Sequence, residues 1–306
     1  PIDASATPSA LDPGDTREVV RIHISPNGAR VIYLRWSDGG TGRLYSVPLA
    51  GGTGVALSPA GEEPGNVLFG LGGTRVVYRS GPPAGDDQSI VYSVPTTGGA
   101  RVALNGSLVL NTNSYNGSPL QIAPDGIGVI FAAVTALGQP VELYGVPIFG
   151  GVAPQKLCDT QTTLTDVMDY AVSPSSTDIL YLADQDTDQV IELYERPVGS
   201  SAPALKVNDP FIDGPIVGDV EWSVIAPGGA HVIYVANQEV SAQDELYSVS
   251  LATGGPPVRL NGPLPEGGNV VLNLMHEATP VITPDGSRVA FAASRPDGSG
   301  YGLYGA

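Results

Sequence analysis

The chain has 306 residues, of which 31 are acidic and 14 basic, and its formal net charge is −17. So acidic a surface repels phosphate backbones, and we expect no nucleic-acid binding. No run of 18 apolar residues occurs, so we expect no insertion into a membrane. The 40 glycines and 28 prolines exclude a mainly helical protein, because both disfavour helix interiors, and favour short strands joined by turns.

Six copies of one pattern follow one another along the chain. Each copy contains an apolar run that includes an aromatic residue. These aromatic residues stand at positions 33, 78, 131, 181, 234 and 291, at intervals of 45 to 57 residues. A turn with proline precedes most runs, as in Ser25-Pro26-Asn27-Gly28 and Thr283-Pro284-Asp285-Gly286. Proline presets φ in such a turn, and glycine accepts a positive φ. The second copy has Leu71-Gly72-Gly73 instead, so its turn is expected to differ.

A second mark follows each run about a dozen residues later. In the first copy it is Leu44-Tyr45, and the pair Gly51-Gly52 then leads to a short run ending in Leu57. This order predicts four strands per copy. The first apolar runs do not alternate with polar residues, so both of their faces must be covered. Blades stacked radially around an axis provide that cover. We therefore predict an all-β, six-bladed β-propeller with four antiparallel strands per blade; a β-sandwich, the alternative, does not explain six copies.

These turns and runs resemble those of the TolB-type propeller family, a WD40-like family whose repeats carry a Ser-Pro-Asp-Gly turn before an apolar strand. The resemblance covers nearly the whole chain. It implies the propeller fold without fixing an activity, because the family includes periplasmic binding propellers, propeller domains of prolyl peptidases and some lyases.

We predict a single propeller domain over residues 1–306, with an N-terminal arm and closing strand in residues 1–18. The six blades are expected at 19–57, 64–104, 116–157, 166–207, 219–260 and 276–306, the last completed by residues 8–12. Only three residues follow Leu303 in this sequence, so we expect the last blade to take its fourth strand from elsewhere.

The candidate for that strand is Ser9, Ala10, Leu11 and Asp12, which resembles Val258-Arg259-Leu260-Asn261 of the fifth copy. An unpaired edge strand is rarely left exposed, so this segment is expected to pair with residues 301–305. It can close its own ring or that of a neighbouring copy, and the second case would build a polymer.

Polar residues recur eight residues before each turn, near the expected mouth of the channel. They are Glu18, Glu63, Asn116, Asp166, Asp219 and His276. Oxygen ligands around an axis suit a hard cation such as Ca²⁺. The alternative interpretation is a set of solvated loop charges.

A second acidic pattern lies in the fourth copy. Asp184, Asp186 and Asp188 alternate, and Glu192 and Glu195 follow, which matches the acidic spacing of a calcium-binding loop. Gln189 stands where such a loop needs glycine. The alternative is an acidic hairpin tip, and Ca²⁺ is the one cofactor that these patterns suggest.

The sequence has no nucleophile elbow, no phosphate-binding loop, no dinucleotide fingerprint and no clustered zinc ligands, so we expect no catalytic residues and no enzymatic activity. We favour a non-catalytic extracytoplasmic scaffold that binds protein partners or copies of itself, with filament formation by N-terminal strand donation as its boldest form. A periplasmic TolB-like partner-binding protein and a metal-dependent polysaccharide lyase-like propeller are the alternatives. The sequence begins at Pro1, which fits a removed leader or a fragment, and we expect an extracellular or periplasmic location.

Overall fold

The computed structural model of this chain describes residues 9–13, 17–36, 41–81, 89–110, 120–159, 166–200, 202–211, 218–240, 242–251, 255–272 and 279–306. The chain divides into two compact units, one formed by residues 1–138 with 144–155 and the other by residues 139–143 with 156–306. Each unit is described by itself. The all-β prediction is confirmed, since the only helical element of the described residues is the short 3-10 turn η1 (Leu71–Gly73).

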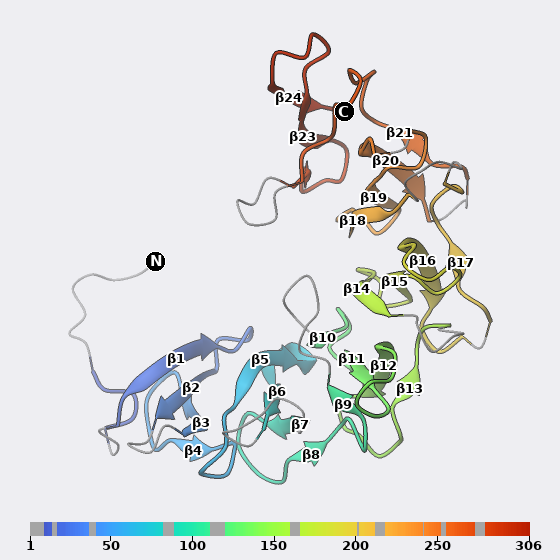
Figure 1. Cartoon of the computed structure of the whole chain (residues 1–306). Helices are drawn as coiled ribbons and strands as arrows, with labels where there is room; N and C mark the ends of the chain where they lie inside the picture. The colour runs from blue at the N-terminus through green and yellow to red at the C-terminus, as the bar shows by residue number, and fades with distance from the viewer. Residues whose placement is uncertain are drawn as a thin grey trace. The chain divides into compact units, whose positions relative to one another are not determined.

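Six antiparallel sheets follow one another along the chain, and we number them 1 to 6 (Figure 1). Sheets 1, 2, 4 and 5 each contain four strands in sequence order. In the first half of the chain the strands are β1 (Val19–Ile24), β2 (Arg30–Trp36), β3 (Gly42–Pro48) and β4 (Val55–Ala56) in sheet 1, β5 (Gly65–Gly70), β6 (Arg75–Ser80), β7 (Ile90–Pro95) and β8 (Val102–Ala103) in sheet 2, and β9 (Val109–Leu110), β10 (Leu120–Ile122), β11 (Gly128–Val134), β12 (Glu142–Pro147) and β13 (Gln155–Lys156) in sheet 3. In the second half they are β14 (Val167–Val172), β15 (Asp178–Ala183), β16 (Glu192–Pro197) and β17 (Leu205–Lys206) in sheet 4, β18 (Val220–Ile225), β19 (His231–Ala236), β20 (Glu245–Ser250) and β21 (Val258–Arg259) in sheet 5, and β22 (Val281–Ile282), β23 (Val289–Ser294) and β24 (Tyr301–Gly305) in sheet 6.

The turns form where the proline and glycine residues predict them. Gly28 has a φ of 67° and its N–H donates to the carbonyl of Ser25 at 2.8 Å, which closes the turn between β1 and β2. In sheet 2 the turn without proline is replaced by η1, inside which Gly72 has a φ of 62°. Glycine accepts this left-handed conformation without steric strain, so the second copy still reverses its chain direction.

An aromatic pair crosses the middle of every sheet. Tyr33 of the second strand lies opposite Tyr45 of the third in sheet 1, with ring centroids 5.6 Å apart, and the centroid distances of all six pairs lie between 5.3 and 6.3 Å. Such pairs contribute about 0.5–1.5 kcal/mol beyond the burial of their area. The repeated aromatic positions of the sequence therefore fix the register of the second and third strands.

Neighbouring sheets pack face to face within each unit. In the N-terminal unit, Leu44 and Leu57 of sheet 1 pack against Val76 and Tyr78 of sheet 2, and sheet 2 packs in the same way on sheet 3. In the C-terminal unit, sheet 4 packs on sheet 5 and sheet 5 on sheet 6. The second strands of sheets 2 and 5 are thus covered on both faces, as their uninterrupted apolar runs predict.

Sheets 3 and 6 depart from the predicted pattern at their first strands. β9 and β10 both pair with β11, and Val270 forms a bridge with Ala293 ahead of β22. The pairing with the second strand therefore begins at Val109 in sheet 3 and at Val270 in sheet 6, earlier than the predicted blade starts at 116 and 276. A count back from the proline cannot detect pairing so far before the turn. Among the described residues, sheet 6 has three strands where the prediction gave every blade four.

Candidate functional site

The fourth strand of each complete sheet is fastened to the third strand by the same two hydrogen bonds. In sheet 1 the N–H of Leu57 donates to the carbonyl of Leu44 at 2.8 Å, and the N–H of Leu44 donates to Oγ of Ser58 at 2.9 Å. We call this apolar–polar residue pair the latch. The five latches are Leu57–Ser58, Leu104–Asn105, Leu157–Cys158, Val207–Asn208 and Leu260–Asn261. Sequence reasoning saw the apolar member and missed the polar one.

Sheet 6 lacks a latch partner among the described residues, and β24 is its edge strand. Leu303 of β24 is 83% exposed. Its counterparts at the same position of the other third strands are fully buried, at 0–1% exposure: Leu44, Val91, Leu143, Leu193 and Leu246. The edge of β24 therefore presents backbone groups and an apolar side chain that the other five sheets cover.

The predicted closing segment lies on the outer face of sheet 1, within the N-terminal unit. Residues 9–12 form no strand there. The carbonyl of Leu11 accepts the N–H of Gly52 at 2.9 Å, and the Leu11 side chain packs against the cluster containing Val31 and Tyr33. Leu11–Asp12 has the apolar–polar order of a latch. The pairing of this segment with residues 301–305 stays a prediction.

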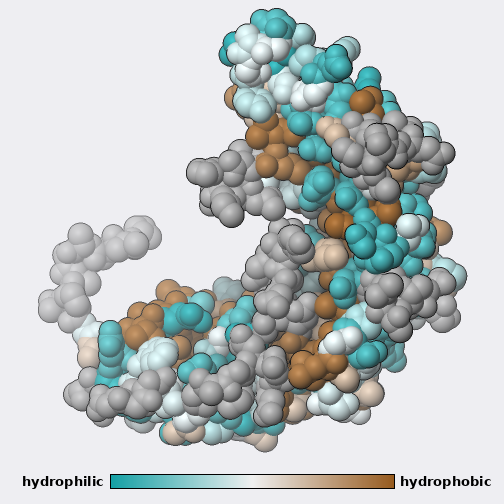
Figure 2. All heavy atoms as spheres, in the orientation of Figure 1, coloured by the Kyte–Doolittle hydropathy of each residue, from teal (hydrophilic) through white to brown (hydrophobic). Residues whose placement is uncertain are grey.

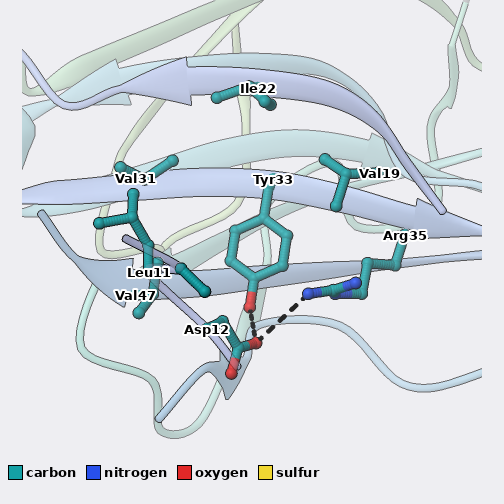
Figure 3. Close-up of a pocket in the computed structure, with 9 residues that line it drawn as sticks. Leu11, Asp12, Val19, Ile22, Val31, Tyr33, Arg35 and Val47 are labelled. Atoms are coloured by element: carbon teal, nitrogen blue, oxygen red, sulfur yellow. Dashed lines mark hydrogen bonds and ion pairs between the residues drawn. The ribbon is translucent and has the colours of Figure 1, made fainter. Parts of the chain in front are cut away.

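Asp12 is held in place by three groups of sheet 1. Its carboxylate accepts the hydroxyl of Tyr33 at 2.5 Å and the N–H of Gly54 at 3.4 Å, and lies 3.7 Å from Nη2 of Arg35 (Figure 3). Burial and the hydrogen bond to Asp12 raise the pKa of Tyr33 to about 12. Tyr33 is therefore a neutral donor at physiological pH, and Asp12 has a fixed position beside it.

A groove of about 220 Å³ lies beside this segment on the same face. Val19, Ile22, Val31 and Val47 line it together with Leu11, as Figure 3 shows. Hydrophobic residues gather over β1 (Figure 2), where Ile22 and Ile24 are 64% and 59% exposed.

The counterparts of Ile22 in two other sheets are buried. Ile22 lies opposite Tyr33, as Leu120 lies opposite Phe131 and Tyr170 opposite Tyr181. Leu120 and Tyr170 are only 2% and 5% exposed. The outer face of sheet 1 therefore has the composition of a sheet-to-sheet interface.

Two of the predicted channel-mouth carboxylates brace consecutive sheets. Oδ1 of Asp166 accepts the N–H of Val141 at 2.6 Å, and Oδ1 of Asp219 accepts the N–H of Ile191 at 2.7 Å. Each aspartate stands just before the first strand of its own sheet. Its carboxylate binds the residue just before the third strand of the preceding sheet. These oxygens hold backbone amides, an interaction that the cation interpretation did not foresee.

The other four predicted channel-mouth residues have different outcomes. Glu18 and Glu63 also precede first strands, and they form backbone hydrogen bonds with Trp36 and Gly81. Asn116 and His276 lie outside the described residues. In sheet 6 the brace is Asn269, whose Oδ1 accepts the N–H of Asp244 at 2.8 Å. The shared sequence Asp-Val or Asn-Val, at 166, 219 and 269, could have identified this position.

The acidic loop of sheet 4 is a hairpin tip whose carboxylates have protein partners. Asp184 is buried, and it accepts the N–H groups of Asp166 and Gln189. The ammonium of Lys206 lies 2.9 Å from Oδ2 of Asp186 and 2.7 Å from Oε1 of Glu192. These contacts favour the hairpin-tip interpretation, with lysine as the cation.

The remaining residues of the calcium pattern do not converge with these. Asp188 accepts the side-chain amide of Gln189 at 3.4 Å, and Glu195 lies farther along β16, opposite Leu180. Gln189 itself has a φ of 61°, the conformation expected of the missing glycine. In the part of the chain that the structure describes, no group of three or more His, Cys, Asp or Glu residues could hold a metal ion. Calcium binding stays a prediction.

The carboxyl of Asp244 is expected to make the free energy of unfolding depend on pH. Burial raises its pKa, so the folded state binds this proton more tightly than the unfolded state does. The resulting stabilisation is complete below the unfolded pKa of about 4 and is lost as the pH rises through the folded pKa. We therefore expect Asp244→Asn to raise the free energy of unfolding at pH 7 and to lose this advantage near pH 4, as measured by urea unfolding at both values.

The matched control is Asp285→Asn. Hydrogen bonds from Thr283 and Ser287 lower the pKa of exposed Asp285 to about 2, so its contribution is present at neutral pH and is lost in acid. This variant should not stabilise the protein at pH 7. An equal effect of Asp244→Asn at both pH values would contradict the assignment to its titration.

Comparison with known proteins shows the fold and leaves the activity open. No protein-family model and no curated protein sequence matches the chain. A solved prolyl endopeptidase is similar to 92% of the chain with a TM-score of 0.54 and 12% identity, and an oligogalacturonate lyase in complex with manganese to 91% with a TM-score of 0.52 and 10% identity. The chain spans 40% of that endopeptidase and 74% of that lyase. TolB from Acinetobacter baumannii matches 92% of the chain at 12% identity, with a TM-score of 0.43 and 64% of its own length covered.

The fold is that of a six-bladed β-propeller. Its six antiparallel sheets and the two similarities with TM-scores above 0.5 carry this conclusion. The particular activities of those two proteins are not shown for this chain. No helix in the described residues is long and apolar enough to cross a membrane.

Proposed function

We propose that this propeller is a non-catalytic, extracytoplasmic assembly scaffold whose copies join head to tail by strand donation. Residues 9–12 of one copy become the fourth strand of sheet 6 in the next copy. A donation of this kind does not close on itself, so it builds a filament. The observation that carries the proposal is the edge of β24, which pairs with no further strand among the described residues, whereas the third strand of each other sheet pairs with a fourth.

The latch defines the pairing atom by atom. In sheet 5 the N–H of Leu260 donates to the carbonyl of Leu246, and the N–H of Leu246 donates to Oδ1 of Asn261. By the same pattern Leu11 would donate to the carbonyl of Leu303, and the Asp12 carboxylate would accept the N–H of Leu303. Backbone pairing supplies the affinity when a strand is added to a sheet edge, and side-chain pockets supply the specificity.

The contacts of the acidic residues support a non-catalytic role. Among the carboxylates considered as metal ligands, those of Asp166 and Asp219 accept backbone amides, and those of Asp186 and Glu192 contact Lys206. No observation on this chain favours the alternatives of a periplasmic TolB-like partner-binding protein or a polysaccharide lyase-like propeller. The partners in this proposal are copies of the chain itself.

Deletion of residues 1–12 tests strand donation. We expect the full chain to form filaments at high concentration, seen by light scattering and electron microscopy. High concentration matters because a tethered strand has an effective concentration in the millimolar range for closing its own ring. The deleted protein should stay monomeric and bind a synthetic peptide of residues 1–13.

The matched control is a deletion of residues 1–8, which retains the latch pair and should still assemble. A full chain that stays monomeric at high concentration would show that the strand closes its own ring. Assembly of the protein lacking residues 1–12 would also make the proposal wrong.

A further inference from the structure

We infer that the edge of β24 selects its fourth strand by the side chain at one position, and that Ala10 is the residue selected. A small, uncharged residue is accepted there, whereas the basic residues of sheets 3, 4 and 5 are rejected. The inference rests on the proposed function, because residues 9–12 must become the fourth strand of sheet 6. The contacts that carry it lie inside single sheets, and they are the same whether the segment comes from the chain itself or from another copy.

The deciding position is the fourth-strand residue just before each latch, which lies opposite the third-strand tyrosine. The pairs are Tyr45–Ala56 in sheet 1, Tyr92–Ala103 in sheet 2, Tyr194–Lys206 in sheet 4 and Tyr247–Arg259 in sheet 5. Lys156 holds the same position in sheet 3, one residue before Leu157 of the latch. The same register would place Ala10 opposite Tyr304 in sheet 6, one residue before Leu11.

Each basic residue at this position pairs with a glutamate of the neighbouring third strand. The nitrogen–oxygen distances are 2.5 Å for Lys156 and Glu142, 2.7 Å for Lys206 and Glu192, and 2.9 Å for Arg259 and Glu245. The glutamate always stands two residues before the tyrosine. In sheets 1 and 2, where alanine holds the fourth-strand position, Arg43 and Ile90 stand there instead. In these sheets the basic residue and the glutamate therefore occur together or not at all.

Burial makes this match a requirement. The side chains of Glu192 and Glu245 are buried, and each also accepts the hydroxyl of its neighbouring tyrosine at 2.9 Å. Removing one partner of a buried ion pair leaves an uncompensated charge, which is strongly destabilising, and an unpaired charge is a means of rejecting a wrong partner. The latch hydrogen bonds follow one pattern in these sheets, so backbone pairing cannot distinguish one fourth strand from another, and side chains must supply the specificity.

Sheet 6 has no glutamate at the matching position. Gly302 stands two residues before Tyr304, so a lysine or arginine opposite Tyr304 would lack the carboxylate that it has in its own sheet. Ala10 brings no charge and repeats the alanines of sheets 1 and 2. The segment and the edge of β24 therefore match in two respects, which are the latch order Leu11–Asp12 and the uncharged residue before it.

A charge-exchange cycle in the full chain tests this selection. Ala10→Lys and Gly302→Glu each introduce one charge without its partner, so each should raise the concentration at which filaments form by about tenfold. The double variant restores the pair found in sheet 4 and should recover most of that loss. Light scattering gives the assembly concentration, and urea unfolding of dilute, monomeric protein gives a second readout.

Ala10→Met and Gly302→Gln are the matched controls, because they keep the length of the side chains and remove the charge. Gly302 has a φ outside the left-handed region, so either substitution suits its backbone. A Cβ atom there would lie 2.9 Å from the hydroxyl oxygen of Tyr304, and glutamate and glutamine must displace that oxygen alike. The double Met–Gln variant should therefore show no recovery over its single variants.

The outcomes separate this inference from strand donation. If filaments form and the Lys–Glu variant is as impaired as the two single variants combined, the selection rule is wrong while strand donation stands. If the chain stays monomeric and the recovery appears in its urea unfolding, the rule stands for a segment that closes its own ring, and strand donation fails. If neither measurement responds to the charged substitutions, or if the Met–Gln variant recovers equally, the inference is overturned.

Discussion

Leu246→Ala is expected to lower the free energy of unfolding by about 2–5 kcal/mol, because it removes a buried side chain and leaves a cavity. Leu303→Ala, at the same position of sheet 6, should change it by no more than about 0.5 kcal/mol in the unassembled protein. Leu246 is fully buried and Leu303 is 83% exposed, so the two variants are a matched pair in residue type, strand and register. The measurement is denaturant unfolding at a concentration at which the protein is monomeric.

The comparison also distinguishes between the two ways of closing sheet 6. In assembled protein, Leu303→Ala should weaken the filament and raise the concentration at which it forms. A loss of stability in the monomer as large as that of Leu246→Ala would mean that Leu303 is already covered there. The face of sheet 6 would then be covered within a single copy, which would count against assembly and favour a ring closed by the chain itself.

Asn261→Ala is expected to lower the free energy of unfolding by about 1–3 kcal/mol, since it leaves the buried N–H of Leu246 without its side-chain acceptor. Asn261 is itself buried, and its Oδ1 lies 2.7 Å from that nitrogen. Asn261→Ser should recover most of the loss, because Ser58 accepts the corresponding N–H in sheet 1. Thermal and denaturant unfolding of the three proteins measure the difference.

If the serine variant were as unstable as the alanine variant, the latch would act through packing and not through its hydrogen bond. The role assigned to Asp12 in the donated strand would then lose its chemical basis. A destabilisation by alanine that serine reverses supports the latch as a device shared by all complete sheets.

Sequence reasoning could not locate the start of the first strands in sheets 3 and 6. A fixed count before each turn proline gave Asn116 and His276 for the positions near the channel mouth, and both lie outside the described residues. That count uses only the distance from the turn and contains no information on strand pairing. The structure gives these register positions to Val109 and Asn269, because pairing with the second strand decides them. A local count cannot contain that information.

Sequence reasoning also could not supply the partners of the acidic residues. The spacing of Asp184, Asp186 and Glu192 suggested a cation, and the structure supplies one from Lys206, which lies on a later strand of the same sheet. Asp166 and Asp219 likewise bind amides of the preceding third strands. Spacing along the chain does not reveal partners that folding brings near, so these contacts could not be predicted from the sequence.

The sequence by itself determined the number of sheets, the order of their strands and the recurring aromatic position of each copy. These follow from local chemistry: turn residues set the reversals, and uninterrupted apolar runs require cover on both faces. Only the tertiary structure decided which polar side chain completes each latch, and that Leu11 packs on Val31 and Tyr33. The reason is physical, since these contacts join residues that are separated in the sequence and meet only when the strands pair.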